Sequence, residues 1–247
     1  MSDARRGTYG HRARIGLLVP STNTVGESEF WRLAPPGVSV HTSRMPFLPD
    51  KHAEPFAAME AEVPRVLEEA VSAAPDVIAY GCTASSAKGD PSVLEAELSG
   101  ESGRPTATAA GALVAALKVF GARRIALVTP YPPETNAKER TFFAENGIEV
   151  VADESVIVDE AQLRFRNMCL VPKAKLVERA IALGRRGDVD AVVLSCADMP
   201  TFEALPEIEA AIGKPVTSSI QALFWRALRL AGIEDRNPAA GRLLARY

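Results

Sequence analysis

The sequence repeats itself, and this internal duplication limits the folds that are open to the chain. RIGLLVP at residues 14–20 returns as RIALVTP at residues 124–130. DVIAYGCT at residues 76–83 returns as DAVVLSCA at residues 190–197. All four segments are short apolar runs of the length and composition of buried strands. A sequence that repeats a strand in the same order predicts a fold that is built twice.

A third pair of segments extends the duplication. RPTATAAGALVAAL at residues 104–117 matches KPVTSSIQALFWRAL at residues 214–228, each a short strand, a turn of small residues and an amphipathic helix. The matched positions keep a nearly constant spacing, since Cys82 and Cys196 lie 114 residues apart and Pro105 and Pro215 lie 110 apart. The repeated unit therefore covers most of the chain.

Helix-like stretches separate the predicted strands, at residues 54–73, 136–146 and 172–186. Strands that alternate with helices favour parallel sheets covered on both faces. We therefore expect an α/β protein of two lobes related by a pseudo-twofold axis, residues 1–120 and 121–247, with the active site at their interface. The helical segment 220–247 is expected to pack back onto the first lobe.

Cys82 and Cys196 each follow a predicted strand and occupy equivalent places in the two repeats. Ligands of α/β proteins bind beyond the carboxyl ends of the strands, so the two cysteines are expected to face each other across a cleft. A single cysteine there is more often a packing residue, but a matched pair favours a reactive site. Cys169 has no counterpart and is expected to pack in the core.

Charge and motif content exclude several functions. The net charge of -3 provides no basic field for nucleic acid. Apolar runs fall short of the roughly 18 residues of a membrane span, and no signal peptide is indicated. Three cysteines without a CxxC pair predict no disulfide framework, no metal site and a cytoplasmic location. Neither a GxGxxG nor a Walker A motif is present, so no nucleotide cofactor is expected.

Several motifs together resemble the maleate isomerases. They are LVPSTNT at 18–24, HTSRM at 41–45, YGCT at 80–83, TPY at 129–131 and LSCADM at 194–199. Residues 194–232 are equally similar to arylmalonate decarboxylases, a sister branch of the aspartate/glutamate racemase superfamily. The resemblance implies that superfamily's fold, with two Rossmann-like lobes that each contain a parallel four-stranded sheet.

The resemblance also implies a reaction without metal or cofactor. Cys82, as a thiolate, would attack an alkene carbon of a small cis-dicarboxylate such as maleate, and Cys196 would exchange the proton. Rotation about the resulting single bond and expulsion of the sulfur would give the trans product. Family members further suggest a homodimer or a higher homo-oligomer.

Substrate-binding residues follow from the same motifs. Asn23 and Tyr131 would donate hydrogen bonds to a carboxylate, while Thr83 and Ala84 would supply backbone N–H groups and the Thr83 hydroxyl. Ala197, next to Cys196, lies in the second cysteine motif. Two alternatives stay open, because Asn23 can instead cap the next helix and Tyr131 can instead anchor its loop.

The partner of the second carboxylate is ambiguous. The position that is Asn in maleate isomerases aligns with Ala161 or Gln162, and Gln162 has the amide that such a role requires. If Ala161 is equivalent, the substrate differs from maleate and nearby polar residues become the candidates for specificity: Arg164, Arg166 and Asn167. Of two further polar candidates, Asp198 is expected to cap a helix and Arg44 to form a surface or inter-lobe salt bridge.

Two other functions compete with isomerisation. Arylmalonate decarboxylases have glycine in place of the first cysteine, so Cys82 argues against decarboxylation. Amino-acid racemases of the superfamily keep both cysteines but open with an Asp- and Gly-containing loop where this chain has STNT. A binding protein without catalysis is a third possibility, against which the intact cysteine pair argues.

Overall fold

Eight strands form two four-stranded sheets in the computed structural model, which describes residues 7–247. Every strand pair in both sheets is parallel. The first sheet has the order β2-β1-β3-β4 and the second the order β6-β5-β7-β8, so the two halves share one topology. The expected two-lobed α/β fold is thereby confirmed. The strands are β1 (Ala13–Pro20), β2 (Val38–Met45), β3 (Val77–Tyr80), β4 (Thr106–Thr108), β5 (Arg124–Thr129), β6 (Glu149–Ser155), β7 (Ala191–Leu194) and β8 (Val216–Ser218).

The duplication extends to single hydrogen bonds. The Asp76 carboxylate, just before β3, accepts from the backbone N–H of Arg14 at 2.8 Å. The Asp190 carboxylate, just before β7, accepts from the backbone N–H of Arg124 at the same distance. Each aspartate therefore links the start of the strand that precedes a cysteine, β3 or β7, to the neighbouring strand of the same sheet, β1 or β5.

Helices cover both faces of each sheet. In the first lobe α3 and α5 lie on one face, and α1 and α10 lie on the other. In the second lobe α8 and α9 cover one face, and α6 and α7 the other. The helices are α1 (Gly26–Leu33), α2 (Pro55–Ala61), α3 (Val63–Ser72), α4 (Thr83–Ser86), α5 (Pro91–Ser102), α6 (Ala109–Phe120), α7 (Pro133–Glu145), α8 (Lys173–Gly184), α9 (Ala204–Ile212), α10 (Ser219–Leu230) and α11 (Arg242–Arg246).

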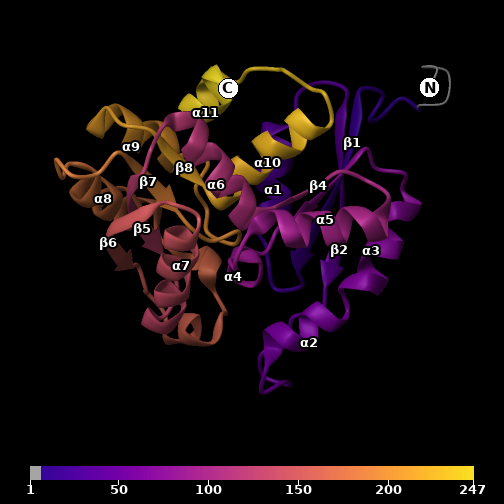
Figure 1. Ribbon diagram of the computed structural model, residues 1–247, viewed down its shortest axis with the longest axis horizontal. Coiled ribbons are helices and arrows are strands. Elements are labelled where there is room, and N and C mark those ends of the chain that lie inside the picture. Colours follow the sequence, from indigo (N-terminus) through magenta and orange to yellow (C-terminus); the bar gives the residue numbers. More distant parts are fainter. Residues whose placement is uncertain (1–6) are drawn as a thin grey trace.

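The stretch 54–73, expected as one helix, is divided into α2 and α3 at Glu62. Pro64 lies in the first turn of α3. A proline has no N–H to donate and its ring collides with the carbonyl four residues earlier, which here belongs to Glu60. The chain therefore ends one helix and begins another, and α2 projects from the lobe at the bottom of Figure 1.

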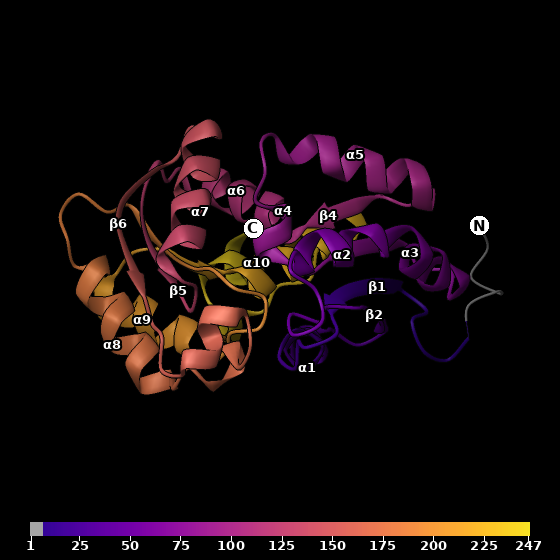
Figure 2. The same cartoon turned by 90° about the horizontal axis from the view of Figure 1, so that it is seen from below.

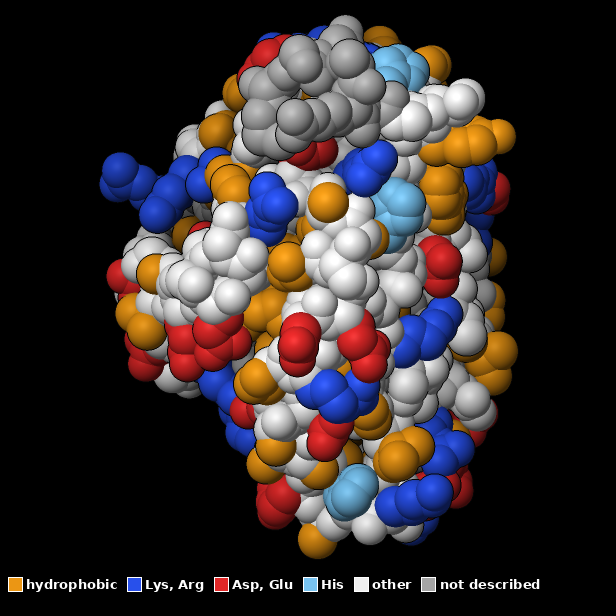
Figure 3. Space-filling model, turned by 90° about the vertical axis from the view of Figure 1, so that its right-hand side faces the viewer, with side chains coloured by type: hydrophobic (Ala, Val, Ile, Leu, Met, Phe, Trp, Pro, Cys, Tyr) orange, Lys and Arg blue, Asp and Glu red, His pale blue; other side chains and the backbone are white. Residues whose placement is uncertain are grey.

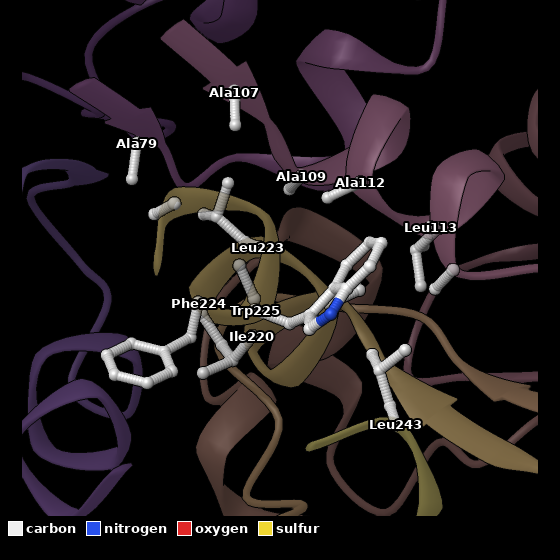
Figure 4. Packing of buried hydrophobic residues seen from close by; sticks show 14 of the residues in the cluster. Ala79, Ala107, Ala109, Ala112, Leu113, Ile220, Leu223, Phe224, Trp225 and Leu243 are labelled. Atoms are coloured by element: carbon white, nitrogen blue, oxygen red, sulfur yellow. The ribbon is translucent and has the colours of Figure 1, made fainter. Parts of the chain in front are cut away.

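Helices α6 and α10 pack against each other between the lobes (Figures 1 and 2). Helix α10, from the end of the chain, lies on β3 and β4 of the first sheet, while α6 contacts β7 and β8 of the second. Their shared interface combines small and large side chains, with Ala112 and Leu113 of α6 beside Trp225 of α10 (Figure 4). Each of these two helices thus packs on the sheet of the other repeat. This exchange of helices joins the inner faces of both sheets in one apolar core.

The surface gives no dominant charge on the face at the first-lobe end of the molecule. Figure 3 shows Lys and Arg side chains interspersed there with Asp and Glu side chains. Within residues 7–247, no helix combines the length and the apolar character that a membrane crossing requires.

Candidate active site

Both predicted cysteines line one pocket between the lobes. The pocket lies at the carboxyl ends of the strands and encloses about 400 Å³ including its open mouth. Cys82 reaches it from the end of β3 and Cys196 from the end of β7, and both side chains are buried. Of the other expected binding residues, five also line it: Asn23, Thr83, Ala84, Tyr131 and Ala197.

Cys82 lies at a tight junction between strand and helix. It is the residue before the short helix α4, and its carbonyl accepts a hydrogen bond from the Ser86 hydroxyl at 2.7 Å. A Cβ on the preceding Gly81 would lie 3.0 Å from the Leu18 carbonyl oxygen, a tight contact that favours glycine at this position. Burial raises the pKa of the Cys82 thiol, and hydrogen bonds from Ser85 partly oppose that rise.

Thr83 presents an unused donor to the pocket. Its side chain is 2% exposed, and its hydroxyl has no hydrogen-bond partner among the described residues. Burial of a hydroxyl group without a hydrogen-bond partner costs free energy. Such a hydroxyl next to a cavity therefore indicates that an oxygen of a bound ligand accepts its hydrogen bond. The arrangement suits a carboxylate held at the start of α4.

Asn23 has the capping role that its motif left open. Its side-chain oxygen accepts from the N–H groups of Val25 and Gly26 at 3.0 and 2.8 Å and so caps the start of α1. Its amide nitrogen donates to the Ala197 carbonyl at 2.8 Å, across the lobe boundary. One N–H of the amide is left for a ligand.

Asp198, which was expected to cap a helix, does so across the lobe boundary, at the start of α1. Its carboxylate accepts from the backbone N–H groups of Thr24 at 2.7 Å and Val25 at 3.3 Å, next to α1. Burial raises the pKa of Asp198 to about 6, although these bonds lower it. The Asp198 charge in turn raises the pKa of the adjacent Cys196 thiol.

Tyr131 and Cys196 interact directly. Burial is the main reason that the pKa of Cys196 lies above its ordinary value, and a hydrogen bond with the Tyr131 phenol acts in the opposite direction. The charges of both cysteines contribute to the raised pKa of Tyr131, so its hydroxyl lies near the two thiols. The phenol therefore stays a neutral donor at physiological pH.

Gln162 does not line the pocket. Its side-chain oxygen accepts from the N–H groups of Val158 at 2.6 Å and Asp159 at 3.0 Å, and its amide nitrogen donates to the Asn167 carbonyl at 3.3 Å. The amide that was expected to bind the second carboxylate is therefore used to hold its own loop. Ala161 also lies outside the lining.

The alternative specificity residues of this loop point elsewhere too. Arg166 forms a salt bridge with Asp50, and Asn167 donates to Asp159 at 2.8 Å. Arg164 is exposed and borders a separate hollow on the surface. Arg44 donates to the Asn23 carbonyl at 2.7 Å and pairs with Glu27, so it stabilises the loop before α1 and does not line the pocket.

Sequence reasoning missed the apolar wall of the pocket. The wall consists of Phe47, Phe56, Phe165 and Met168, which come from three segments of both lobes. Nothing in a single phenylalanine distinguishes a pocket wall from an ordinary core position. Glu139 was also missed, a buried glutamate of α7 that lies near Cys196 and Tyr131.

The fold and the pocket together define a class of protein. A duplicated α/β fold that brings one cysteine from each half to a shared pocket, with donors for a carboxylate beside them, is typical of enzymes that use paired thiols for covalent or acid–base chemistry.

Comparison with known proteins places the chain within that class. Residues 62–244 match the family model described as arylmalonate decarboxylase. The chain is 32% identical to the maleate isomerase of Alcaligenes faecalis, over 94% of this chain and 96% of that protein. The maleate isomerase of Pseudomonas putida S16, solved with maleate, superposes with a TM-score of 0.84 at 27% identity and covers 94% of this chain and 97% of its own.

A third relative bears on the chemistry. A cysteine-to-serine variant of the maleate cis-trans isomerase of Nocardia farcinica, with a covalently bound succinylcysteine intermediate, superposes with a TM-score of 0.79 at 29% identity. The match covers 95% of this chain and 99% of that one. The chain belongs to the branch of the aspartate/glutamate racemase superfamily that contains the maleate isomerases and the arylmalonate decarboxylases.

Proposed function

We propose that the protein is a cofactor-independent cis–trans isomerase of small cis-enedioates, with the conversion of maleate to fumarate as its reference reaction. The observation that supports this most is the pair of cysteines on one pocket beside the unpartnered Thr83 hydroxyl. A succinylcysteine intermediate in the related Nocardia farcinica isomerase agrees with covalent chemistry at such a site.

The reaction begins when the Cys82 thiolate attacks one alkene carbon. A C–S bond forms, and the π electrons move onto the neighbouring carbon and its carboxylate as an enediolate. Thr83, the N–H group of Ala84 and the Tyr131 phenol stabilise this charge, because donors fixed in a buried site need no reorganisation when charge develops.

Cys196 then protonates the carbanionic carbon, so that the former double bond becomes a freely rotating single bond. After rotation Cys196 takes the proton back, the C–S bond breaks and the trans acid leaves. Cys82 is therefore the nucleophile and Cys196 the acid and base.

Proton NMR tests this proposal directly. Purified protein mixed with maleate and no additive is expected to lose the maleate signal and gain that of fumarate. The Cys82→Ser and Cys196→Ser variants are each expected to lose about 10³-fold or more of this activity, because the thioether or its proton exchange is lost. Cys169→Ser is the matched control, since Cys169 lies outside the pocket, and it is expected to keep full activity. Full activity without Cys82 would contradict the mechanism.

The second candidate is a two-cysteine racemase of an amino acid or a decarboxylase of a substituted malonate. The match to the arylmalonate decarboxylase model favours it. In deuterium oxide, racemisation would introduce deuterium at the carbon next to the carboxylate, whereas decarboxylation would release carbon dioxide. Proton NMR in deuterium oxide with maleate, an amino acid and a substituted malonate as substrates therefore separates the three reactions.

The location and the assembly are also proposals. We expect a cytoplasmic protein that forms a homodimer or a higher homo-oligomer, as the resemblance to its family implies. Light scattering during size-exclusion chromatography would give the mass of the particle in solution, and a monomer would contradict this expectation.

A further inference from the structure

Two kinds of side chain line the pocket. Hydrogen-bond donors are provided by Thr83, Asn23 and Tyr131. Apolar side chains are provided by Phe47, Phe56, Phe165 and Met168, which we call the aromatic wall. No Lys, Arg or His of residues 7–247 lines the pocket, and the acidic group that does is Asp198. A carboxylate in this pocket would therefore be held by neutral donors, without a cationic side chain.

The aromatic wall is a packed cluster of rings from both lobes. The Phe47 and Phe56 centroids lie 4.9 Å apart, and the Phe56 and Phe165 centroids lie 4.8 Å apart at nearly right angles. The Phe165 centroid also lies 5.9 Å from that of the Tyr131 ring, so the wall adjoins one of the donors. Such edge-to-face clusters are stable and present an apolar surface to the cavity.

The loop itself fixes Phe165 in this wall. Residues Glu160–Arg164 form a single 3-10 turn, and Asp159 and Gln162 close a capping box around it. Phe165 ends the turn in the left-handed conformation, with φ of 56°, and its N–H donates to the Gln162 carbonyl at 3.0 Å. The turn therefore consumes the amide of Gln162 and directs the Phe165 ring into the pocket.

A second carboxylate would be poorly placed against this wall. It would lose its hydration without gaining a donor, because rings and a thioether offer none. An apolar substituent gains free energy in the same place by leaving water. The thiol chemistry needs only one carboxylate, since a single carboxylate can accept the electron pair as an enediolate.

Resting on the proposed isomerase chemistry but departing from the enedioates of its reference reaction, we propose that the preferred substrate is a cis-2-alkenoate with one carboxylate and an apolar, preferably aromatic, group on the far alkene carbon. The Cys82 thiolate adds to the carbon that bears the apolar group, and the π electrons pass to the carboxylate. Cys196 delivers its proton to the carbon between them. Rotation and the reverse of these two steps release the trans isomer, so no further reactant is consumed.

Turnover of two substrates tests the proposal. The wild-type protein is expected to convert cis-cinnamate with a kcat/KM at least about 10-fold higher than that for maleate, since burial of a phenyl group is worth more than one factor of ten. Phe165→Asn, which places an amide in the wall, is expected to reverse this order. Phe165→Leu leaves the wall apolar and is expected to retain the preference for cis-cinnamate over maleate. A wild-type protein that prefers maleate would overturn the inference and leave the isomerase function intact.

Two further measurements complete the design. Leu163→Asn makes the same chemical change on the same loop at a side chain that is 51% exposed and outside the pocket, so it is expected to leave the substrate ratio unchanged. Binding of saturated acids to the wild-type protein reports on the pocket without any reaction. 3-Phenylpropanoate is expected to bind at least about 10-fold more tightly than succinate. That result in a protein that isomerises no alkene would sink the proposed function alone, and tighter binding of succinate would sink this inference.

Discussion

At the scale of the residue, single side chains beside the pocket make contacts in both lobes. Asn23 caps α1 with its oxygen and contacts the Ala197 carbonyl with its nitrogen. Asp198 caps the same helix from the opposite lobe and raises the pKa of the neighbouring Cys196. Because each of these groups joins the two lobes next to a thiol, a small shift between the lobes would change the geometry of the pocket and the acidity of the thiol together.

Burial of the Glu139 carboxyl group costs free energy, and its protonation state in the folded protein can be measured. Its side chain is 1% exposed, and neither carboxyl oxygen has a hydrogen-bond partner among the described residues. Burial raises the pKa of Glu139 from 4.5 to about 8, which the nearby Ser195 hydroxyl only partly offsets. At neutral pH the folded protein therefore holds this carboxyl in its neutral form.

We predict that Glu139 makes the stability of the protein fall with rising pH. Between the ordinary pKa of a glutamate and about 8, the folded protein keeps a proton that the unfolded chain has lost. The free energy of unfolding then decreases by up to about 1.4 kcal/mol per pH unit in this window and levels off above it. Glu139→Gln stays neutral, so its stability relative to the wild type should increase through the same window.

Urea denaturation at a series of pH values measures this difference. Glu134→Gln, on the exposed side of the same helix, is the matched control and should leave the pH dependence unchanged. Parallel pH profiles for the wild type and Glu139→Gln would mean that the glutamate is ionised in the folded protein.

At the scale of the element, the decisive contact is that between α1 of the first lobe and the loop that follows β7 in the second. The buried Glu29 carboxylate accepts from the N–H groups of Thr201 at 2.6 Å and Phe202 at 2.9 Å. It also accepts from the Thr201 hydroxyl, whose oxygen lies 2.8 Å from the hydroxyl of Ser218 at the start of α10. A single side chain thus fixes two loops that lie close to Cys196.

Removal of this carboxylate should be costly. We predict that Glu29→Ala lowers the free energy of unfolding by roughly 2–3 kcal/mol, because it leaves two buried N–H groups without partners. Glu27→Ala changes the same residue type on the same helix, at a side chain that is 41% exposed, and should cost under about 0.5 kcal/mol. Chemical denaturation gives both values, and equal losses would show that Glu29 has no special role.

At the scale of the whole molecule, the exchange of α6 and α10 makes one folding unit of two repeats. The core cluster that contains these helices includes Ile15 and Leu17 of β1 as well as Ile125 and Leu127 of β5. Neither lobe can expose its inner sheet face without also uncovering the helix of the other. This shared core explains how the two lobes can keep the two thiols at one pocket.

We predict a single cooperative unfolding transition for the whole chain. Tryptophan fluorescence, from Trp225 buried on α10 and Trp31 half-exposed on α1, and far-ultraviolet circular dichroism, which reports on all helices, should give the same midpoint in urea. Leu223→Ala, in the shared core, should lower both midpoints together at a cost of about 2–5 kcal/mol. Two separated transitions would show instead that the lobes unfold independently.

The sequence predicted the fold, the two cysteines and the hydrogen-bond donors of the pocket better than it predicted the aromatic wall. Repeated motifs reveal the sheets, because buried strands carry their signal in a short contiguous run. The same motifs contain Cys82 and Cys196, which the strands carry to one pocket. The loop 158–167 has no such signal, so the family's asparagine position aligned ambiguously with Ala161 or Gln162, and in the structure neither residue lines the pocket.

What the sequence alone determined was the duplicated α/β fold and the placement of one cysteine at the end of an equivalent strand in each half. Local patterns of apolar and small residues suffice for this, since the carboxyl ends of parallel strands lie at one edge of a sheet. Only the tertiary structure decided that Asp198 caps the opposite lobe, that Gln162 turns away and that Phe165 forms the wall. These outcomes depend on which side chains meet across the lobes, and no local pattern in the chain records such contacts.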